Sequence, residues 1–253
     1  MKHKMPGQIL FLTFLLFTSN IFSQNALTDT SRLQKAVQHT IDFYIEEIGG
    51  DSHLFNGPGH RGYMRPAISH PYYLSEDIQT GTLWFDGIFY KNVPLMYDIT
   101  GDHLITLQYV KDSSYQYRSI FKMDLPREKT GGFTLGSREF IKLEPDTNTT
   151  RMKPGFYELM HNGKVKLIVR RSKVYAEQIR DRDLERRYDS TSTYYLLKDG
   201  IFHHITSKKV LLGVLKDKRS ALAAYIKKNK WKFRKQREVM IPEVAHYYEQ
   251  LTN

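Results

Sequence analysis

Residues 80–110 read TGTLWFDGIFYKNVPLMYDITGDHLITLQYV, and this stretch decides the fold. It holds four short apolar or aromatic runs, at 83–85, 88–90, 93–99 and 103–110, separated by Asp86-Gly87, Lys91-Asn92 and Gly101-Asp102. Asp-Gly between two β-prone runs is a strong hairpin signal, because glycine tolerates the positive φ that a tight primed turn requires. Three turns within so short a stretch predict an antiparallel meander.

The pattern of short strands continues to residue 206. Alternating runs at 116–123 and 137–143 predict two strands, with a turn region at 129–132 between them. Asn162-Gly163 turns a predicted hairpin of 155–160 and 164–171, and Asp199-Gly200 turns another of 193–197 and 201–206. Residues 174–192 are dense in charge and predict an exposed excursion or a distorted strand pair. We expect eight to ten strands, most of them joined to their sequence neighbours.

Helices are predicted on both sides of the strands. An apolar stripe at steps of three and four predicts a helix from about residue 29 to Ile48, where Gly49-Gly50 ends it. After Ser207, apolar spacing predicts two or three helices, the last with Pro242 as a kink or as its first turn. The expected fold class is therefore α+β and β-rich, with an antiparallel meander forming an open barrel or a curved sheet, one N-terminal helix and two or three C-terminal helices.

The first residues predict export. Lys2 and Lys4 precede the apolar core ILFLTFLLF at 9–17, which is too short to span a bilayer and is typical of a secretory signal peptide cleaved after Ser23 or Ala26. An uncleaved anchor is the alternative. The chain has no cysteine, so neither a disulfide nor a lipidated cysteine is available. We divide the chain into 1–23 (signal peptide), 24–206 (helix and β domain) and 207–253 (basic helical region), and expect the periplasm, the inner face of the outer membrane, or secretion.

The positive charge is concentrated in the last 47 residues. Without residues 1–23 the net charge is +9, of which residues 207–253 carry +8. Basic residues interleaved with aromatic ones suit an anionic membrane surface or an envelope protein partner, and export argues against nucleic acid. The predicted contact residues are Lys218, Arg219, Lys227, Lys228, Lys230, Trp231, Lys232, Arg234 and Lys235. The alternative is a solvated helix pair whose aromatic and aliphatic side chains, Trp231 among them, form its buried face.

Residues 51–75 have no periodicity and many turn formers. A loop of this length is either a ligand-facing loop, with His60, Arg61, Tyr63 and His70 converging on a site, or an irregular strap across the sheet. We predict no metal site and no cofactor, since His203 and His204 would point to opposite faces of a strand. No catalytic motif is recognisable, which favours a non-catalytic role, although a triad assembled from distant residues needs no motif.

Three segments carry a family resemblance. They are GTLWFDGIFYKNVPLMYDITGDHLI, PGFYELMHNGKVKLIVRR and the end from LKDKRSALAAYIKKNKWKF onward. They resemble an uncharacterised family of secreted, signal-peptide-bearing Bacteroidota proteins, and the resemblance implies export and a β-rich body but no activity. Our leading hypothesis is a non-catalytic envelope protein whose basic helical tail contacts an anionic surface or partner. The alternatives are a carrier of an apolar ligand in a curved sheet and a hydrolase with its site in the 51–75 loop.

Overall fold

The computed structural model describes Lys35, Leu54 and residues 57–63, 67–111, 117–145, 152–180 and 182–252, with backbone alone at 109–111 and 117–120. The chain divides into two compact units between Ile41 and Asp42, and the structure described below belongs to the second. The predicted signal peptide lies outside the described residues. So does the predicted N-terminal helix, apart from Lys35.

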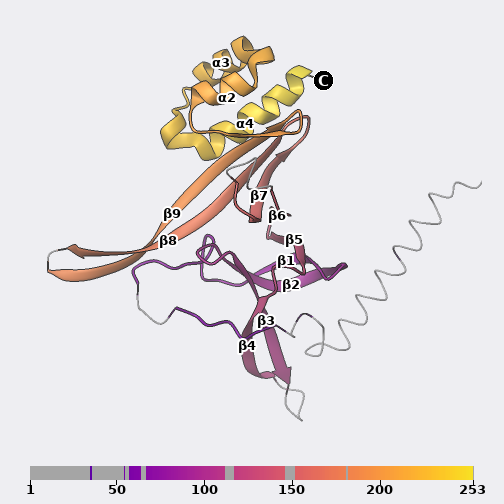
Figure 1. The fold of residues 1–253 in the computed structure, drawn as a ribbon, viewed down its shortest axis with the longest axis vertical. Helices are drawn as coiled ribbons and strands as arrows, with labels where there is room; N and C mark the ends of the chain where they lie inside the picture. Colours follow the sequence, from indigo (N-terminus) through magenta and orange to yellow (C-terminus); the bar gives the residue numbers. More distant parts are fainter. Residues whose placement is uncertain are drawn as a thin grey trace, which may run out of the picture. The chain divides into compact units, whose positions relative to one another are not determined.

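Ten antiparallel strands of the described residues form one sheet that is not closed (Figure 1). They are β1 (Gln79–Phe85), β2 (Ile88–Asp98), β3 (His103–Lys111), β4 (Tyr117–Leu125), β5 (Thr130–Leu135), β6 (Arg138–Leu143), β7 (Gly155–Asn162), β8 (Lys166–Arg180), β9 (Asp183–Lys198) and β10 (Ile201–His204). The order across the sheet is β10-β9-β8-β7-β6-β5-β1-β2-β3-β4. Two meanders, β1–β4 and β5–β10, therefore meet where β1 pairs with β5.

The link between the two meanders requires the sheet to curl. Residues 126–129 connect β4 at one edge to β5, four strand spacings away in the sheet order. Four spacings of about 4.8 Å make about 19 Å in a flat sheet, whereas the five Cα steps from Leu125 to Thr130 reach about 17 Å when fully extended. The link is in fact folded, because the Thr130 amide donates to the Pro126 carbonyl at 3.2 Å. Strands β1–β4 must therefore roll back toward β5, as expected of a curved sheet.

The turn predictions have mixed outcomes. Asp86-Gly87 and Asp199-Gly200 are two-residue turns with positive φ at both positions, which confirms both Asp-Gly hairpins. The predicted turn at Lys91-Asn92 is wrong, because both residues lie inside β2. They form a bulge opposite the single residue Thr82, and Asn92 takes up the extra residue with a φ of 55°.

Two further regions differ in detail from the sequence prediction. Residues 129–132 were predicted as a turn, yet β5 begins at Thr130 and pairs with β1 on one side and β6 on the other. The region 174–192 is a regular strand pair, in register from Lys166 opposite Leu197 to Arg180 opposite Asp183. Because β7 pairs with β8 only over the first residues of β8, the two strands continue as a two-stranded ribbon (Figure 1).

The described C-terminal region forms α2 (Lys208–Val214), a 3₁₀ turn (Lys216–Lys218), α3 (Arg219–Lys228) and α4 (Phe233–Thr252), which confirms the prediction of two or three helices. The Ser207 side chain caps α2 by accepting from the Val210 amide at 3.2 Å. Gln236 is the non-helical residue inside α4, so the break precedes Pro242, which is not in the first turn.

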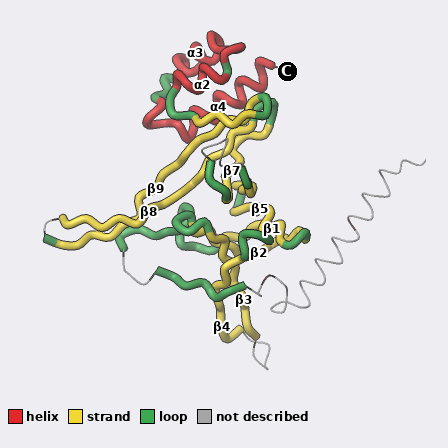
Figure 2. Tube along the Cα trace, viewed as in Figure 1, coloured by secondary structure: helices red, strands yellow, loops and turns green. Residues whose placement is uncertain are grey.

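The helices share a core with the ends of the strands. Leu222, Ile226, Met240, Ile241 and Val244 form one buried cluster with Val165, Leu167, Val169, Tyr194 and Leu196. The three helices lie together over β7–β9 (Figure 2). The helical region is therefore packed on the sheet through an apolar face, and its deletion would expose that part of the core to water.

A second core fills the inner face of β1–β7. Tyr97, Phe133, Phe140 and Phe156 are buried there, with ring centroids 4.8 to 6.0 Å apart. These separations are those of aromatic pairs in direct contact inside a close-packed core. The described aromatic residues of this face therefore belong to the core.

Candidate functional site

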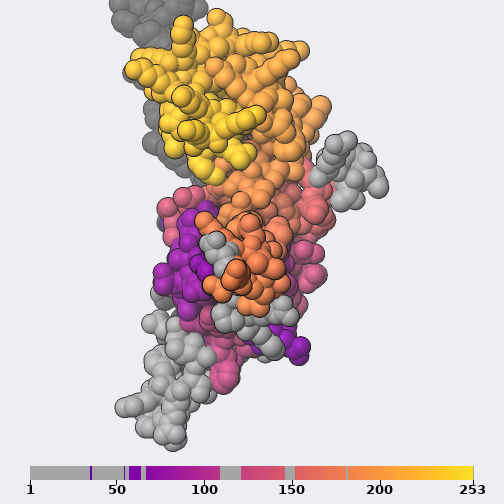
Figure 3. All heavy atoms as spheres, turned by 90° about the vertical axis from the view of Figure 1, so that its left-hand side faces the viewer, coloured from indigo at the N-terminus to yellow at the C-terminus, as the bar shows by residue number. Residues whose placement is uncertain are grey.

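The first candidate is a strap, which we define as residues 57–63 and 67–75 of the long loop. Backbone hydrogen bonds tie it to β4 through His60 and Lys122, to β2 through Tyr73 and Tyr97, and to β9 through Ile68. The strap thus contacts strands that are far apart in the sheet order. In Figure 3, spheres in the indigo-to-purple colour of the strap lie beside the orange spheres of β8 and β9. This agrees with the strap interpretation of the loop.

The strap also brings histidine and tyrosine side chains together. His60 Nδ1 lies 2.7 Å from the Asp124 carboxylate, and its Nε2 lies 3.5 Å from the Tyr72 hydroxyl. The side chain of His60 is 6% exposed. The Tyr63 hydroxyl donates to the buried Asp98 carboxylate at 2.7 Å, and burial followed by this hydrogen bond raises the pKa of Tyr63.

Lys173 of β8 holds the same cluster from the other side. Its ammonium donates to the backbone carbonyls of His70 and Tyr72, each at 2.7 Å. Burial lowers the pKa of Lys173, and burial together with the nearby ammonium lowers the pKa of His70. His60, Tyr63 and His70 therefore belong to one polar cluster. Arg61 is exposed and does not contact it.

The chemistry of this cluster is limited. An imidazole bonded to a carboxylate can accept a proton, but no Ser or Thr hydroxyl of the described residues hydrogen-bonds to His60. Across the described part of the chain there is also no group of three His, Cys, Asp or Glu residues that could hold a metal ion. The contacts of His60, Tyr63 and Lys173 anchor the strap.

The second candidate is a basic surface at the junction of α3 and α4. We define it by six exposed side chains, Lys227, Lys228, Lys230, Lys232, Arg234 and Lys235. Among the described residues, none of the six has an ion pair with a carboxylate. The first turn of α4, which precedes the break at Gln236, also contains no acidic residue.

The structure separates the nine predicted contact residues into groups. Lys218 and Arg219 lie at the start of α3, and a rise of 1.5 Å per residue places Lys228 about 13 Å further along the helix. Trp231 is half-buried against the helical core, with its ring edge-on to Tyr225 at 5.4 Å. Tyr225 in turn stacks on Tyr247 at 4.3 Å. Trp231 is therefore a packing residue, as the alternative interpretation of the tail predicted.

A partly buried ionic network, which the sequence did not predict, links α4 to the sheet. The Arg171 guanidinium lies 2.6 Å from the Glu158 carboxylate and donates to both oxygens of Glu238, at 2.5 and 2.9 Å. Arg138 also donates to Glu158, at 2.5 Å, and Tyr194 donates to Glu238. A signal was available, because Glu158 lies on the same face of β7 as Phe156 and Met160, and Arg171 follows Leu167 and Val169 on the inward face of β8.

No helix of the described residues is long and apolar enough to cross a membrane. Comparison of the chain with protein-family models, with curated proteins and with solved structures finds no match.

Proposed function

We propose that the protein is an exported, non-catalytic protein of the cell envelope that binds anionic lipid surfaces through the basic surface of α3 and α4. One observation carries the proposal: six exposed cations lie within nine residues of the chain, and none of them has a carboxylate partner among the described residues. Like charges this close repel one another, so the arrangement costs stability unless an anion is bound.

The magnitude is sufficient for reversible binding. A Lys or Arg close to an anionic leaflet contributes about 1 kcal/mol. Three to six such contacts give roughly 3 to 6 kcal/mol, which is an affinity in the millimolar to tens-of-micromolar range per lipid patch. Such binding is electrostatic and must weaken with salt, because the Debye length falls from about 8 Å at 0.15 M to about 3 Å at 1 M.

The packing of the aromatic side chains near the basic surface favours lipid over nucleic acid as the ligand. Single-stranded nucleic acid is bound by basic grooves in which aromatic rings stack on the bases. The aromatic residues between these cations, Trp231 and Phe233, are instead packed against the helical core, and the Trp231 ring also lies edge-on to Tyr225. The surface therefore offers charge without a stacking platform. The predicted signal peptide, with Lys2 and Lys4 before its apolar core, also supports export, away from cytoplasmic nucleic acid.

The test is co-sedimentation of the purified protein with vesicles of phosphatidylcholine alone or with one third phosphatidylglycerol. We expect binding to the anionic vesicles alone, lost by 1 M salt. The variant Lys227→Gln, Lys230→Gln, Lys232→Gln removes about 3 kcal/mol and should bind roughly a hundredfold more weakly. The control Lys153→Gln, Lys166→Gln, Lys209→Gln removes the same charge from exposed positions elsewhere and should bind like the unaltered protein.

Three outcomes would overturn the proposal. Binding to neutral vesicles as strong as to anionic ones would make the interaction apolar. If both triple variants bound anionic vesicles equally weakly, binding would depend on the net charge of the protein and not on the basic surface. A short DNA duplex that displaces the protein from vesicles at stoichiometric amounts would assign the surface to nucleic acid. Charge substitution is a better test than deletion of residues 207–253, because the deletion would also expose the shared core.

A further inference from the structure

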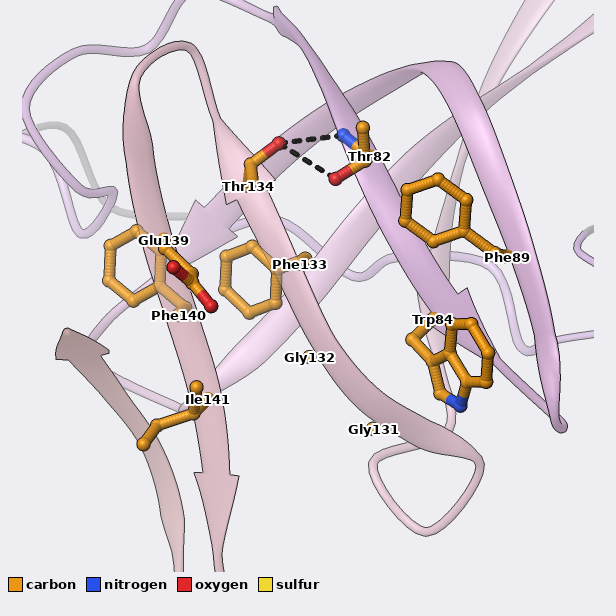
Figure 4. Close-up of a pocket in the computed structure, with 10 residues that line it drawn as sticks. All are labelled: Thr82, Trp84, Phe89, Gly131, Gly132, Phe133, Thr134, Glu139, Phe140 and Ile141. Atoms are coloured by element: carbon orange, nitrogen blue, oxygen red, sulfur yellow. Dashed lines mark hydrogen bonds between the residues drawn. The ribbon is translucent and has the colours of Figure 1, made fainter. Parts of the chain in front are cut away.

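A groove lies on the outer face of the sheet, across β1, β2, β5 and β6. Side chains alternate between the two faces of a strand, so Leu83 and Phe85 enter the core while Thr82 and Trp84 point outward. The groove has a volume of about 260 Å³. The lining residues that bear on a ligand are Thr82, Trp84, Phe89, Gly132, Thr134 and Glu139 (Figure 4).

One wall of the groove is aromatic. Trp84 is 50% exposed, and its indole lies beside the ring of Phe89 with centroids 5.9 Å apart and planes tilted by 40°. Phe89 is the cross-strand partner of Trp84 in the β1–β2 pair. Figure 4 shows the two rings together on one side of the groove. A half-exposed indole held in place by a neighbouring ring presents a flat apolar surface to a ligand.

The floor is made flat by glycine. A Cβ at Gly131 would lie 2.7 Å from Trp84 Cδ1, and a Cβ at Gly132 would lie 2.9 Å from the Phe140 carbonyl oxygen. Neither position has room for a side chain without a shift of its neighbours. Gly132 is the cross-strand partner of Trp84 on one side and of Ile141 on the other. The glycines therefore open a trough between the aromatic wall and β6.

The far side of the groove carries polar groups beside Ile141. Thr134 Oγ1 accepts from the Thr82 amide at 2.9 Å, and the two threonine hydroxyls lie 2.9 Å apart. Glu139 is exposed, and its carboxylate has neither an ion pair nor a hydrogen bond with any described residue. Figure 4 shows Glu139 across β5 from Trp84. A ligand here would meet an apolar plane on one side and hydroxyl and carboxylate acceptors on the other.

We propose that this groove binds a neutral sugar, one hexose ring of a glycan, with the C–H face of the ring on Trp84 and its hydroxyls toward Thr134 and Glu139. A hexose has one apolar face and a rim of hydroxyl donors, which matches the two sides of the groove. An alkyl chain would leave the Glu139 carboxylate without a hydrogen-bond donor. Anionic sugars should bind more weakly than neutral ones, because Glu139 repels a second carboxylate. This site is distinct from the basic surface of α3 and α4.

The chain suits a direct optical test, because Trp84 and Trp231 are its two tryptophans. In the variant Trp231→Phe, Trp84 is the sole indole and its emission reports on the groove. We expect a saturable change on titration with at least one of the tetramers of glucose, mannose and N-acetylglucosamine. A galacturonate tetramer should bind at least tenfold more weakly, and the further change Glu139→Gln should reduce that difference to less than threefold.

Matched measurements keep the result unambiguous. The reciprocal variant Trp84→Phe retains Trp231 as its indole and should show no change with the same sugars, while calorimetry should show a loss of affinity of at least tenfold. Circular dichroism of both variants checks that the fold is retained. No saturable change with any of the three neutral tetramers would overturn the proposal. An equal response in the Trp84→Phe variant, or a response to decanoate but to no sugar, would overturn it as well.

Discussion

Replacement of Arg171 by methionine should remove the ion pair that links β8 to Glu238 of α4, and it should destabilise the whole second unit. The side chains of Arg171 and Glu158 are 8% and 3% exposed, so the pair is shielded from water. Removing the cation leaves Glu158 buried beside Arg138, whose side chain is 41% exposed. Breaking a buried ion pair from one side costs about 3 to 5 kcal/mol, and we expect a loss of this order because Arg138 and Tyr73, which still donate to Glu158, compensate its charge only in part.

The loss in free energy of unfolding can be measured by urea denaturation followed by far-ultraviolet circular dichroism. In thermal unfolding of a chain of this size, a loss of about 3 to 5 kcal/mol corresponds to a fall in Tm of roughly 6 to 20 °C. The matched control is Arg138→Met, which removes the more exposed of the two cations from the same carboxylate and should cost about 1 kcal/mol. A double variant, Arg171→Met with Glu158→Met, should be more stable than Arg171→Met alone, since no buried charge is left on the sheet.

If Arg171→Met lowered the free energy of unfolding no more than Arg138→Met does, the shielding of the Arg171–Glu158 pair from water would not matter for stability. If the double variant were less stable than the single one, the penalty would come from lost packing and not from an unpaired charge.

Three further predictions concern the helical core, the strap and pH. Leu222→Ala should lower the free energy of unfolding by about 2 to 5 kcal/mol through a cavity under α3, and a cost below about 1 kcal/mol in urea denaturation would contradict the shared core. Lys173→Met should remove two charge-assisted hydrogen bonds to strap carbonyls and speed proteolysis within residues 57–75, so an unchanged cleavage rate would count against the anchor. Burial raises the pKa of Glu238, but hydrogen bonds from Arg171 and Tyr194 outweigh it and hold the pKa below its usual 4.5. The contribution of Glu238 to stability is therefore full above about pH 4.5 and is lost as the pH falls through its folded pKa. The urea midpoint should drop in that window, and less steeply in Glu238→Gln.

Much of the sheet was predictable, because hairpins are local. The turns at Asp86-Gly87 and Asp199-Gly200 depend on residues that accept positive φ, and a sequence displays them directly. The same reasoning failed at Lys91-Asn92, where an asparagine with positive φ makes a bulge inside β2. Both a bulge and a tight turn accept the same residue types, so the choice between them depends on the partner strand.

The candidate sites divide in the same way. Exposed lysines close together in the chain, such as Lys227 and Lys230, form a surface that the sequence predicts, because neighbours in sequence are neighbours in space. The partners of His60 and Arg171 were not predictable, since Asp124 and Glu238 lie more than sixty residues away. A buried charge at an inward position shows that a partner is required, but it does not identify that partner.

By itself, the sequence determined the antiparallel strands, their tight turns, the C-terminal helices and the concentration of positive charge, all of which depend on residues within a few positions of one another. The tertiary structure alone decided that β1 pairs with β5, that Trp231 packs inward, and that Trp84 faces a trough floored by Gly132. The physical reason is that these contacts depend on the curl of the sheet and on the register between distant strands. Both are selected by the packing of the whole core and not by any local pattern.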